Sequence, residues 1–291
     1  MYSVQIHGAH YAPVSRAYAN AGDGTRCGFG RDPGPARAGS AGDPTILGRK
    51  GRNLLQEELV SPVFIVGYLE TEKPKQVTHT LNALRKEIMN DPYFDGIPSL
   101  SSTRHGFHAN KDCPEVRERV FRALQELDLK VHMVVARKDL ARFRKKFDLK
   151  AKRLYGYLVS KLFENRLHLY QEIDVYFAEM GNTVREQNMR AAIEQAMETF
   201  RRKWGRENEN TIRCFIQPAS NMPQLQAIDY MVWSVYRAYT AGEFRFYNFM
   251  RNRISLVLDI FDEENYPNNY YTSKNPLTRE KIGSTRDPSG G

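Results

Sequence analysis

Four short apolar runs, separated by amphipathic stretches, constrain the fold of this chain more than any other sequence feature. Each run is bounded by turn-forming residues and has the length of a buried strand, whereas the stretches between them repeat apolar residues at helical spacing. Strands that alternate with helices in this way are typical of an α/β domain. The expected strands are Pro62–Leu69, Leu129–Ala136, Ile173–Glu179 and Thr211–Pro218.

One expected helix carries polar groups in an unusual place. Residues Gln224–Tyr239 have an apolar stripe at helical spacing, and Gln226 and Asp229 lie together beside that stripe. A carboxylate next to a core stripe requires a compensating partner or a function. The other expected helices are Lys75–Met89, Pro114–Leu127, Leu140–Phe147, Lys150–Phe163 and Val184–Trp204.

The two ends of the chain differ in composition from the middle. Residues 1–40 contain no Lys, Leu or Glu, although Gly, Ala, Arg and Pro are abundant there. Such a segment buries little apolar surface, so we expect residues 1–40 to be an irregular leader. Beyond Asp262 the sequence is polar, aromatic and interrupted by proline, which predicts an irregular tail over residues 263–291. The predicted domain therefore spans residues 41–262.

The charge of the chain points to polyanionic partners. Its formal net charge is +9 at pH 7, so its surface should attract nucleic acid, with an affinity that weakens as salt rises. Much of the excess lies in Arg137–Arg153. That stretch is either a solvated helical face or a strip that contacts phosphates.

Cysteine content and hydropathy indicate the cellular setting. Cys27, Cys113 and Cys214 are the only cysteines, and they form no CxxC pair, so neither a disulfide framework nor a structural zinc site is supported. A reducing, cytoplasmic location fits this pattern. No apolar run reaches the roughly 18 residues needed to span a bilayer, so we expect no membrane association.

Motifs at four places along the chain occur in one order and in one context of strands and helices. They are AGDPTILGRKG (Ala41–Gly51), FHANKDCPEVRERVF (Phe107–Phe121), VYFAEMG (Val175–Gly181) and LQAIDYMVWSVYR (Leu225–Arg237). Together they resemble the bacterial family called domain of unknown function 3800, from about Ala41 to Asp262. The resemblance implies a ribonuclease H-like fold, which is an α/β fold with a mixed sheet flanked by helices.

The resemblance is incomplete at its N-terminal motif. Members of the family begin with a strand that runs into Asp-Glu-Ser/Ala-Gly-Asp, whose first Asp is the metal-binding acid. The matching stretch here is Gly39-Ser40-Ala41-Gly42-Asp43, so the last three positions agree and the first two do not. We hypothesise that a frameshift or misassigned start has replaced the native first strand. Reading the neighbouring frame of the gene tests this, since a strand ending in Asp-Glu must appear there.

The resemblance also implies a site in which carboxylates converge at strand ends and bind Mg²⁺ or Mn²⁺. Hard cations take oxygen ligands, and two ions about 3.5–4 Å apart stabilise the attacking and leaving oxygens of phosphodiester hydrolysis. The expected metal ligands and catalytic acids are Asp229, Glu179 and Asp43. His108 is expected to orient a water or to move a proton near neutral pH. Gln226 is expected to hold Asp229 or to contact substrate.

Each of these residues also has a purely structural interpretation. Asp229 is placed to interact with the positive end of its helix or with a nearby arginine, and Glu179 to be a surface acid before a turn. Asp43 precedes a proline in a usual turn arrangement, and a half-buried His108 is commonly satisfied by backbone. Asp112 is expected to belong to the start of the helix that follows it rather than to a metal site.

Two functional classes follow. The first is a metal-dependent nuclease or phosphodiesterase acting on nucleic acid, which agrees with the resemblance, the acids and the positive charge. The alternative is a catalytically inactive nucleic-acid-binding or protein-interaction module, because the first acid of the family motif is missing. Metal-dependent turnover distinguishes the two classes.

Overall fold

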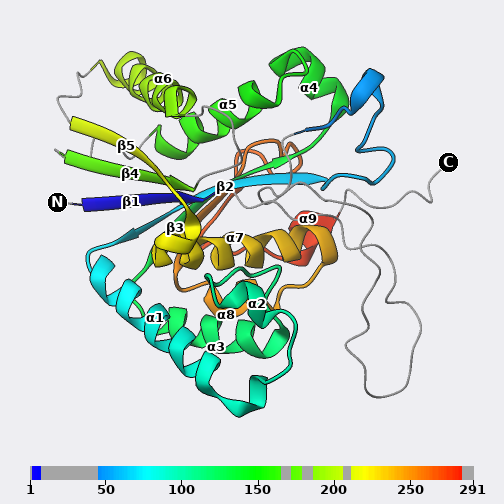
Figure 1. Ribbon diagram of the computed structural model, residues 1–291. Coiled ribbons are helices and arrows are strands. Elements are labelled where there is room, and N and C mark those ends of the chain that lie inside the picture. Colours follow the sequence, from blue (N-terminus) through cyan, green and yellow to red (C-terminus); the bar gives the residue numbers. More distant parts are fainter. Residues whose placement is uncertain (1, 8–44, 165–171, 179–185, 206–210, 284–291) are drawn as a thin grey trace.

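The computed structural model describes residues 2–7, 45–164, 172–178, 186–205 and 211–283, which form one mixed sheet with helices on both faces (Figure 1). The strands of this sheet lie in the order β5-β4-β1-β2-β3-β6-β7. Their bounds are β1 Tyr2–His7, β2 Val63–Thr71, β3 Lys130–Arg137, β4 Glu172–Ala178, β5 Thr211–Gln217, β6 Ile254–Asp259 and β7 Tyr270–Tyr271.

Among the described strands, β2 and β7 run opposite to the other five. β1 pairs with β2 and β2 with β3 in antiparallel ladders, whereas β4 runs parallel to β1 and β5 parallel to β4. β6 runs parallel to β3 on the other side, and β7 closes that edge as an antiparallel partner of β6. The expected α/β fold with a mixed sheet flanked by helices is therefore confirmed.

The helices cover both faces of the sheet (Figure 1). On the upper face in that view lie α4, α5 and α6; α7 packs on the opposite face, with α1, α3 and α8 beyond it. The bounds are α1 Pro74–Asn90, α2 Leu100–Thr103, α3 Pro114–Gln125, α4 Leu140–Phe147, α5 Ala151–Phe163, α6 Glu186–Trp204, α7 Pro223–Ala241, α8 Arg245–Met250 and α9 Arg279–Gly283. Short 3-10 helices are η1 Arg49–Gly51, η2 Pro92–Phe94 and η4 Ala219–Asn221.

β2 is the central strand and is buried on both faces. Ile65 and Leu69 belong to the core on the α7 side, whereas Phe64 and Tyr68 belong to the core on the α5 side. A strand covered on both faces reads as a continuous apolar run instead of an alternating one. This is why Pro62–Leu69 has no polar residue.

α7 is the buried helix that positions the candidate site. Pro223 occupies its first turn, where a missing N–H is tolerated. Its residues up to Tyr236 are all buried, and it ends at Gly242, whose φ of 62° is the left-handed conformation that glycine adopts readily. The helix approaches β2 closely at Gly67, where a Cβ would lie 3.0 Å from a methyl carbon of Val232. Gly67 therefore allows α7 to lie directly on the sheet.

The N-terminal leader differs from the expectation at its start. Tyr2–His7 forms β1 between β2 and β4, with Gln5 opposite Leu69 on one side and Tyr176 on the other. The alternation of Val4 and Ile6 with polar residues is a strand pattern, but it is too short to stand out from the unusual composition around it. The expectation of an irregular leader is therefore wrong for residues 2–7. Residues 8–40 lie outside the described part of the chain.

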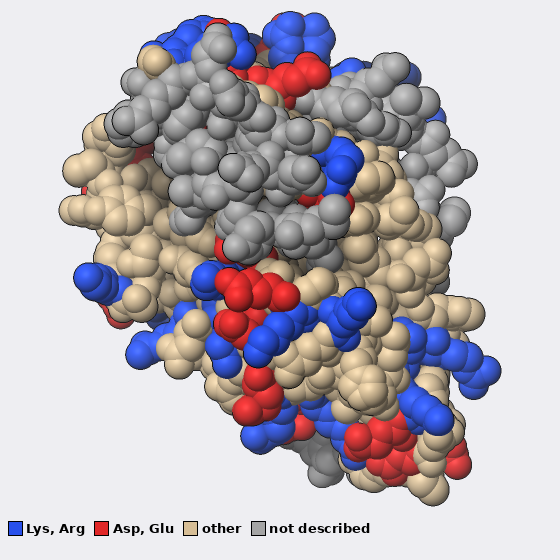
Figure 2. Space-filling model, turned by 90° about the vertical axis from the view of Figure 1, so that its left-hand side faces the viewer, with Lys and Arg blue, Asp and Glu red and all other residues tan. Residues whose placement is uncertain are grey.

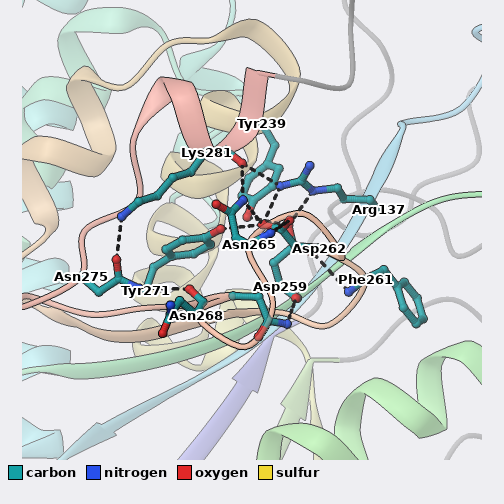
Figure 3. A network of polar contacts seen from close by, with 11 residues as sticks. Arg137, Tyr239, Asp259, Phe261, Asp262, Asn265, Asn268, Tyr271, Asn275 and Lys281 are labelled. Carbon is teal, nitrogen blue, oxygen red and sulfur yellow. Dashed lines mark hydrogen bonds and ion pairs between the residues drawn. The ribbon is translucent and has the colours of Figure 1, made fainter.

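The C-terminal segment also differs from the predicted irregular tail, since β7 and α9 dock onto the end of the sheet (Figure 3). Arg137 at the end of β3 contacts Asp259 at 2.7 Å and Asp262 at 3.1 Å. The hydroxyl of Tyr271 donates to Asp262 at 2.6 Å, and the side-chain amide of Asn265 donates to the same oxygen at 2.8 Å. This buried network extends the folded part of the chain beyond Asp262.

Candidate functional site

The loop between α2 and α3 is held against the first half of α7 by side chains of that helix. The amide oxygen of Gln226 accepts a hydrogen bond from the backbone N–H of Phe107 at 3.0 Å, and Asp229 accepts one from the N–H of Ala109 at 2.8 Å. Gln226 and Asp229 face the same side because residues three apart in a helix are neighbours. The acid beside the core stripe thus has a backbone partner.

Asp112 holds the same loop from within. Its carboxylate accepts from the backbone N–H of His108 at 2.7 Å, from the hydroxyl of Thr103 at 2.6 Å and from the hydroxyl of Tyr230 at 2.6 Å. Asp112 is 2% exposed. Burial raises the pKa of its carboxyl above the ordinary value, although the three hydrogen bonds act in the opposite direction. The carboxylate therefore ties the loop to both α2 and α7.

Arg117 of α3 holds the loop from the other side. Its guanidinium donates to the carbonyl oxygen of Ala109 at 3.1 Å and also to the carbonyl oxygen of Asp112. The guanidinium carbon lies 5.1 Å from the centre of the Trp233 ring, within the range of a cation–π contact. Backbone donors and acceptors of residues 107–112 are thus bound from two helices, which makes the loop a rigid support.

His108 is the residue that this support presents. Its Nδ1 lies 3.3 Å from Oδ2 of Asp229, and its side chain is 32% exposed, whereas that of Asp229 is 3% exposed. A carboxylate beside one ring nitrogen can orient an imidazole. The arrangement therefore places a partly exposed imidazole, a group capable of proton transfer, next to a buried carboxylate.

The structure brings together three of the residues predicted from sequence. Asp229, His108 and Gln226 meet at the loop, as the contacts above show. Gln226, however, is 1% exposed, and its amide nitrogen donates to the carbonyl oxygen of Ala219 at 2.8 Å. Both ends of the amide are engaged by backbone, so Gln226 supports the loop and is not placed to contact substrate.

The other two predicted acids lie outside the described residues. Asp43 precedes the first described residue of its segment, and Glu179 directly follows Ala178, the last residue of β4. Ala178 packs against the core on the α7 side. Their parts in the site remain predictions.

Sequence reasoning missed the residues that fix the loop. Asp112 was assigned to the start of α3, but that helix begins after Cys113, and no side chain caps it. Tyr230 has a fully buried ring on the core side of α7, yet its hydroxyl donates to Asp112. Burial raises the pKa of this hydroxyl well above its ordinary value, so Tyr230 remains a hydrogen-bond donor.

Two side chains at the loop are of types that can bind a metal ion. Asp229 offers a carboxylate oxygen and His108 an imidazole nitrogen, and both are ligand types that Mn²⁺ accepts, while Mg²⁺ prefers oxygen alone. Within the described ranges, no three His, Cys, Asp or Glu side chains lie close enough together to hold a metal ion. A complete site would therefore need carboxylates such as Glu179 from outside those ranges.

Comparison with known proteins adds a distant structural similarity. No family model matches the chain, and no curated protein matches it in sequence. A solved structure described as the complex of PCNA with RNase HII from Archaeoglobus fulgidus is similar with a TM-score of 0.35 and 8% identity, over 63% of this chain and 67% of that one.

The basic stretch Arg137–Arg153 is used largely for structural contacts. Arg137 is held in the buried network with Asp259 and Asp262. Lys146 lies 4.1 Å from the ring centre of Tyr157, and Lys150 forms an ion pair with Asp148 at 2.7 Å. Much of this charge is therefore matched locally. Among the described helices, none is long and apolar enough to cross a membrane.

Proposed function

We propose that this protein is a metal-dependent phosphodiesterase that acts on nucleic acid, with Asp229 and His108 at its centre. The observation that carries the proposal is the contact between Nδ1 of His108 and Oδ2 of Asp229, on a loop fixed by four further side chains. Catalytic groups need this kind of preorganised support. The resemblance to a family with a ribonuclease H-like fold and the net charge of +9 agree with it.

Each residue has a role in the proposal. Asp229 would hold Mg²⁺ or Mn²⁺ together with Glu179 and Asp43, and the metal would stabilise charge on the reacting phosphate. His108, kept in place by Asp229, would hold or move a proton at an oxygen of the scissile phosphodiester. Gln226 and Asp112 would keep the loop, and hence the imidazole, in position. The free thiols of Cys113 and Cys214 fit the proposed cytoplasmic location.

The test is cleavage of labelled single-stranded and double-stranded DNA and RNA with Mg²⁺ or Mn²⁺. Asp229→Asn keeps an oxygen that can accept from Ala109 but loses the charge, so we expect cleavage to fall by at least about 100-fold with the fold intact. Asp95→Asn removes a carboxylate from an exposed surface position and should cleave like the wild type. Equal cleavage by the wild type and Asp229→Asn would falsify the proposal.

A second candidate is an inactive nucleic-acid-binding or protein-interaction module. It is favoured by one observation, that Oδ2 of Asp229 already accepts the Ala109 N–H and so has a supporting role of its own. This candidate predicts nucleic-acid binding that falls with salt, without turnover in Mg²⁺ or Mn²⁺. Cleavage by the wild type excludes it.

A further inference from the structure

A groove runs along α1 beside the start of α7, and positively charged side chains line it. Its volume is about 600 Å³, and its polar lining includes Lys75, His79, Asn82, Lys86 and Gln224. None of the residues that line it is an Asp or a Glu. The groove is therefore positive without a compensating carboxylate in its walls.

The spacing of these residues explains why they share one side of α1. Lys75, His79, Asn82 and Lys86 follow one another at intervals of three or four residues, so they lie along one face of the helix. All four are exposed. Within the described part of the chain, neither Lys75 nor Lys86 forms an ion pair. Glu87, an acid of the same helix, pairs instead with Arg119 of α3 at 3.3 Å.

The groove is tied rigidly to the helix that carries the candidate site. The side-chain amide of Gln224 donates to the carbonyl oxygen of Pro74 at 2.7 Å and to the hydroxyl of Thr78 at 2.8 Å. Gln226, two residues further along α7, holds the loop of His108. Two residues span about 3 Å along a helix axis and point to roughly opposite sides of it, so the groove and the loop lie on different sides of the same turn of α7.

The charge on this side of the molecule is otherwise mixed. Figure 2 shows Lys and Arg side chains next to groups of Asp and Glu, without a single uniform basic field. A polyanion is therefore not attracted equally to the whole face. The groove differs from the surrounding surface because its two lysines have no carboxylate partner among the described residues, so it should attract a polyanion more strongly.

We propose that the α1 groove binds the sugar-phosphate backbone of a nucleic acid strand and directs it to His108. The direction toward His108 rests on the proposed function, whereas binding of the strand stands on the groove alone. Lys75 and Lys86 contact phosphates, and His79 and Asn82 donate hydrogen bonds between them. Such contacts position a strand without reading its sequence. In this proposal the groove contributes to the affinity for the nucleic acid strand, and the loop of His108 carries the group that takes part in cleavage.

The experiment measures binding of a fluorescein-labelled single-stranded oligonucleotide in EDTA, so that cleavage does not contribute. Lys75→Ala/Lys86→Ala is compared with Lys145→Ala/Lys152→Ala, which removes two exposed charges on α4 and α5 across the sheet. We expect the groove variant to bind about tenfold more weakly and its log–log salt slope to shrink by about 1.4, since each phosphate contact on a single strand contributes about 0.7. The control should bind like the wild type.

Three results overturn the groove assignment: no binding by the wild type, wild-type affinity in the groove variant, or equal losses in both variants. If the alanine variant melts early, Lys75→Gln/Lys86→Gln keeps most of the side-chain length and must show the same loss. The proposed function fails separately. Unchanged cleavage in Asp229→Asn would contradict the nuclease assignment but not the binding of nucleic acid in the groove. Unchanged binding in the groove variant would contradict the groove assignment but not the nuclease assignment.

Discussion

The Nδ1 atom of His108 lies 3.3 Å from Oδ2 of Asp229, and the same oxygen accepts the backbone N–H of Ala109 at 2.8 Å. One buried carboxylate therefore binds the backbone of the loop and lies beside the imidazole that the loop carries. The two residues come from segments that are distant in sequence but pack in the same core, the loop before α3 and the helix α7. Changes at either end should affect the position of the imidazole.

Loss of the Tyr230 hydroxyl should increase the mobility of this loop without creating a cavity in the core. Tyr230→Phe keeps the ring but removes a donor to the buried Asp112, so we expect a loss of about 1–3 kcal/mol in the free energy of unfolding. Amide exchange of Phe107–Asp112 should become faster. Tyr93→Phe, at a ring that is 68% exposed, is the control and should change neither. Unchanged exchange in Tyr230→Phe would show that Asp112 does not hold the loop.

Two glycine substitutions should have opposite effects on stability. In Gly67→Ala the new Cβ would lie 3.0 Å from Val232 and 3.1 Å from Met133, so α7 or β3 must shift, at a cost of about 1–3 kcal/mol. In Gly156→Ala, inside α5, nothing lies within 4 Å of the new Cβ, and the better helix former should add up to about 1 kcal/mol. Urea unfolding measures both. A neutral Gly67→Ala would contradict the close approach of α7 to β2.

Arg137 should be essential for the stability of the C-terminal segment. Arg137→Ala leaves the buried Asp259 and Asp262 without their cation, and we expect a loss of about 3–5 kcal/mol. Arg202→Ala breaks an exposed helical pair with Glu198 and should cost less than about 1 kcal/mol. Thermal melts compare the two variants. Similar losses in both would mean that the network in Figure 3 does not anchor β7 and α9.

The two acids of this network should respond to pH in opposite directions. Burial raises the pKa of Asp262, but hydrogen bonds from Tyr271 and Asn265 outweigh it, so the folded pKa lies below the ordinary value. Its contribution to stability is therefore present above pH about 4 and is lost as pH falls through the folded pKa. For Asp259, burial outweighs Arg137 and raises the pKa, so its contribution is present below pH about 4 and is lost as pH rises through the folded pKa.

Melting temperatures of Asp262→Asn and Asp259→Asn between neutral and acid pH measure this contrast. The deficit of Asp262→Asn relative to the wild type should shrink in acid, and the deficit of Asp259→Asn should grow. Parallel curves for the two variants would contradict the opposite pKa directions.

Long elements with a strong pattern could be predicted from the sequence. The apolar run Pro62–Leu69 became β2, Val63–Thr71, and the stretch Lys75–Met89 became α1, Pro74–Asn90. Short elements could not, because β1 has only six residues and is surrounded by an unusual composition. β7 and α9 depend on Arg137, which is distant in sequence, so no local pattern indicates them.

The candidate site could be predicted only in part for the same reason. Asp229 stands out in the sequence because a carboxylate beside a core stripe requires a partner. That partner is a backbone N–H 120 residues away, and a backbone group leaves no signature in the sequence. Asp112 looked like a helix-start residue because its position before Pro114 has that local meaning. Only the fold places it beside Tyr230.

Asp229 as a metal ligand of a nuclease site is tested most directly by Mn²⁺ titration followed by electron paramagnetic resonance, without nucleic acid. The wild type and the surface variant Asp95→Asn should bind Mn²⁺ with the same affinity, and Asp229→Asn should bind it at least about tenfold more weakly, because an uncharged amide replaces a carboxylate ligand. Equal Mn²⁺ binding by the wild type and Asp229→Asn would contradict the placement of the metal at Asp229.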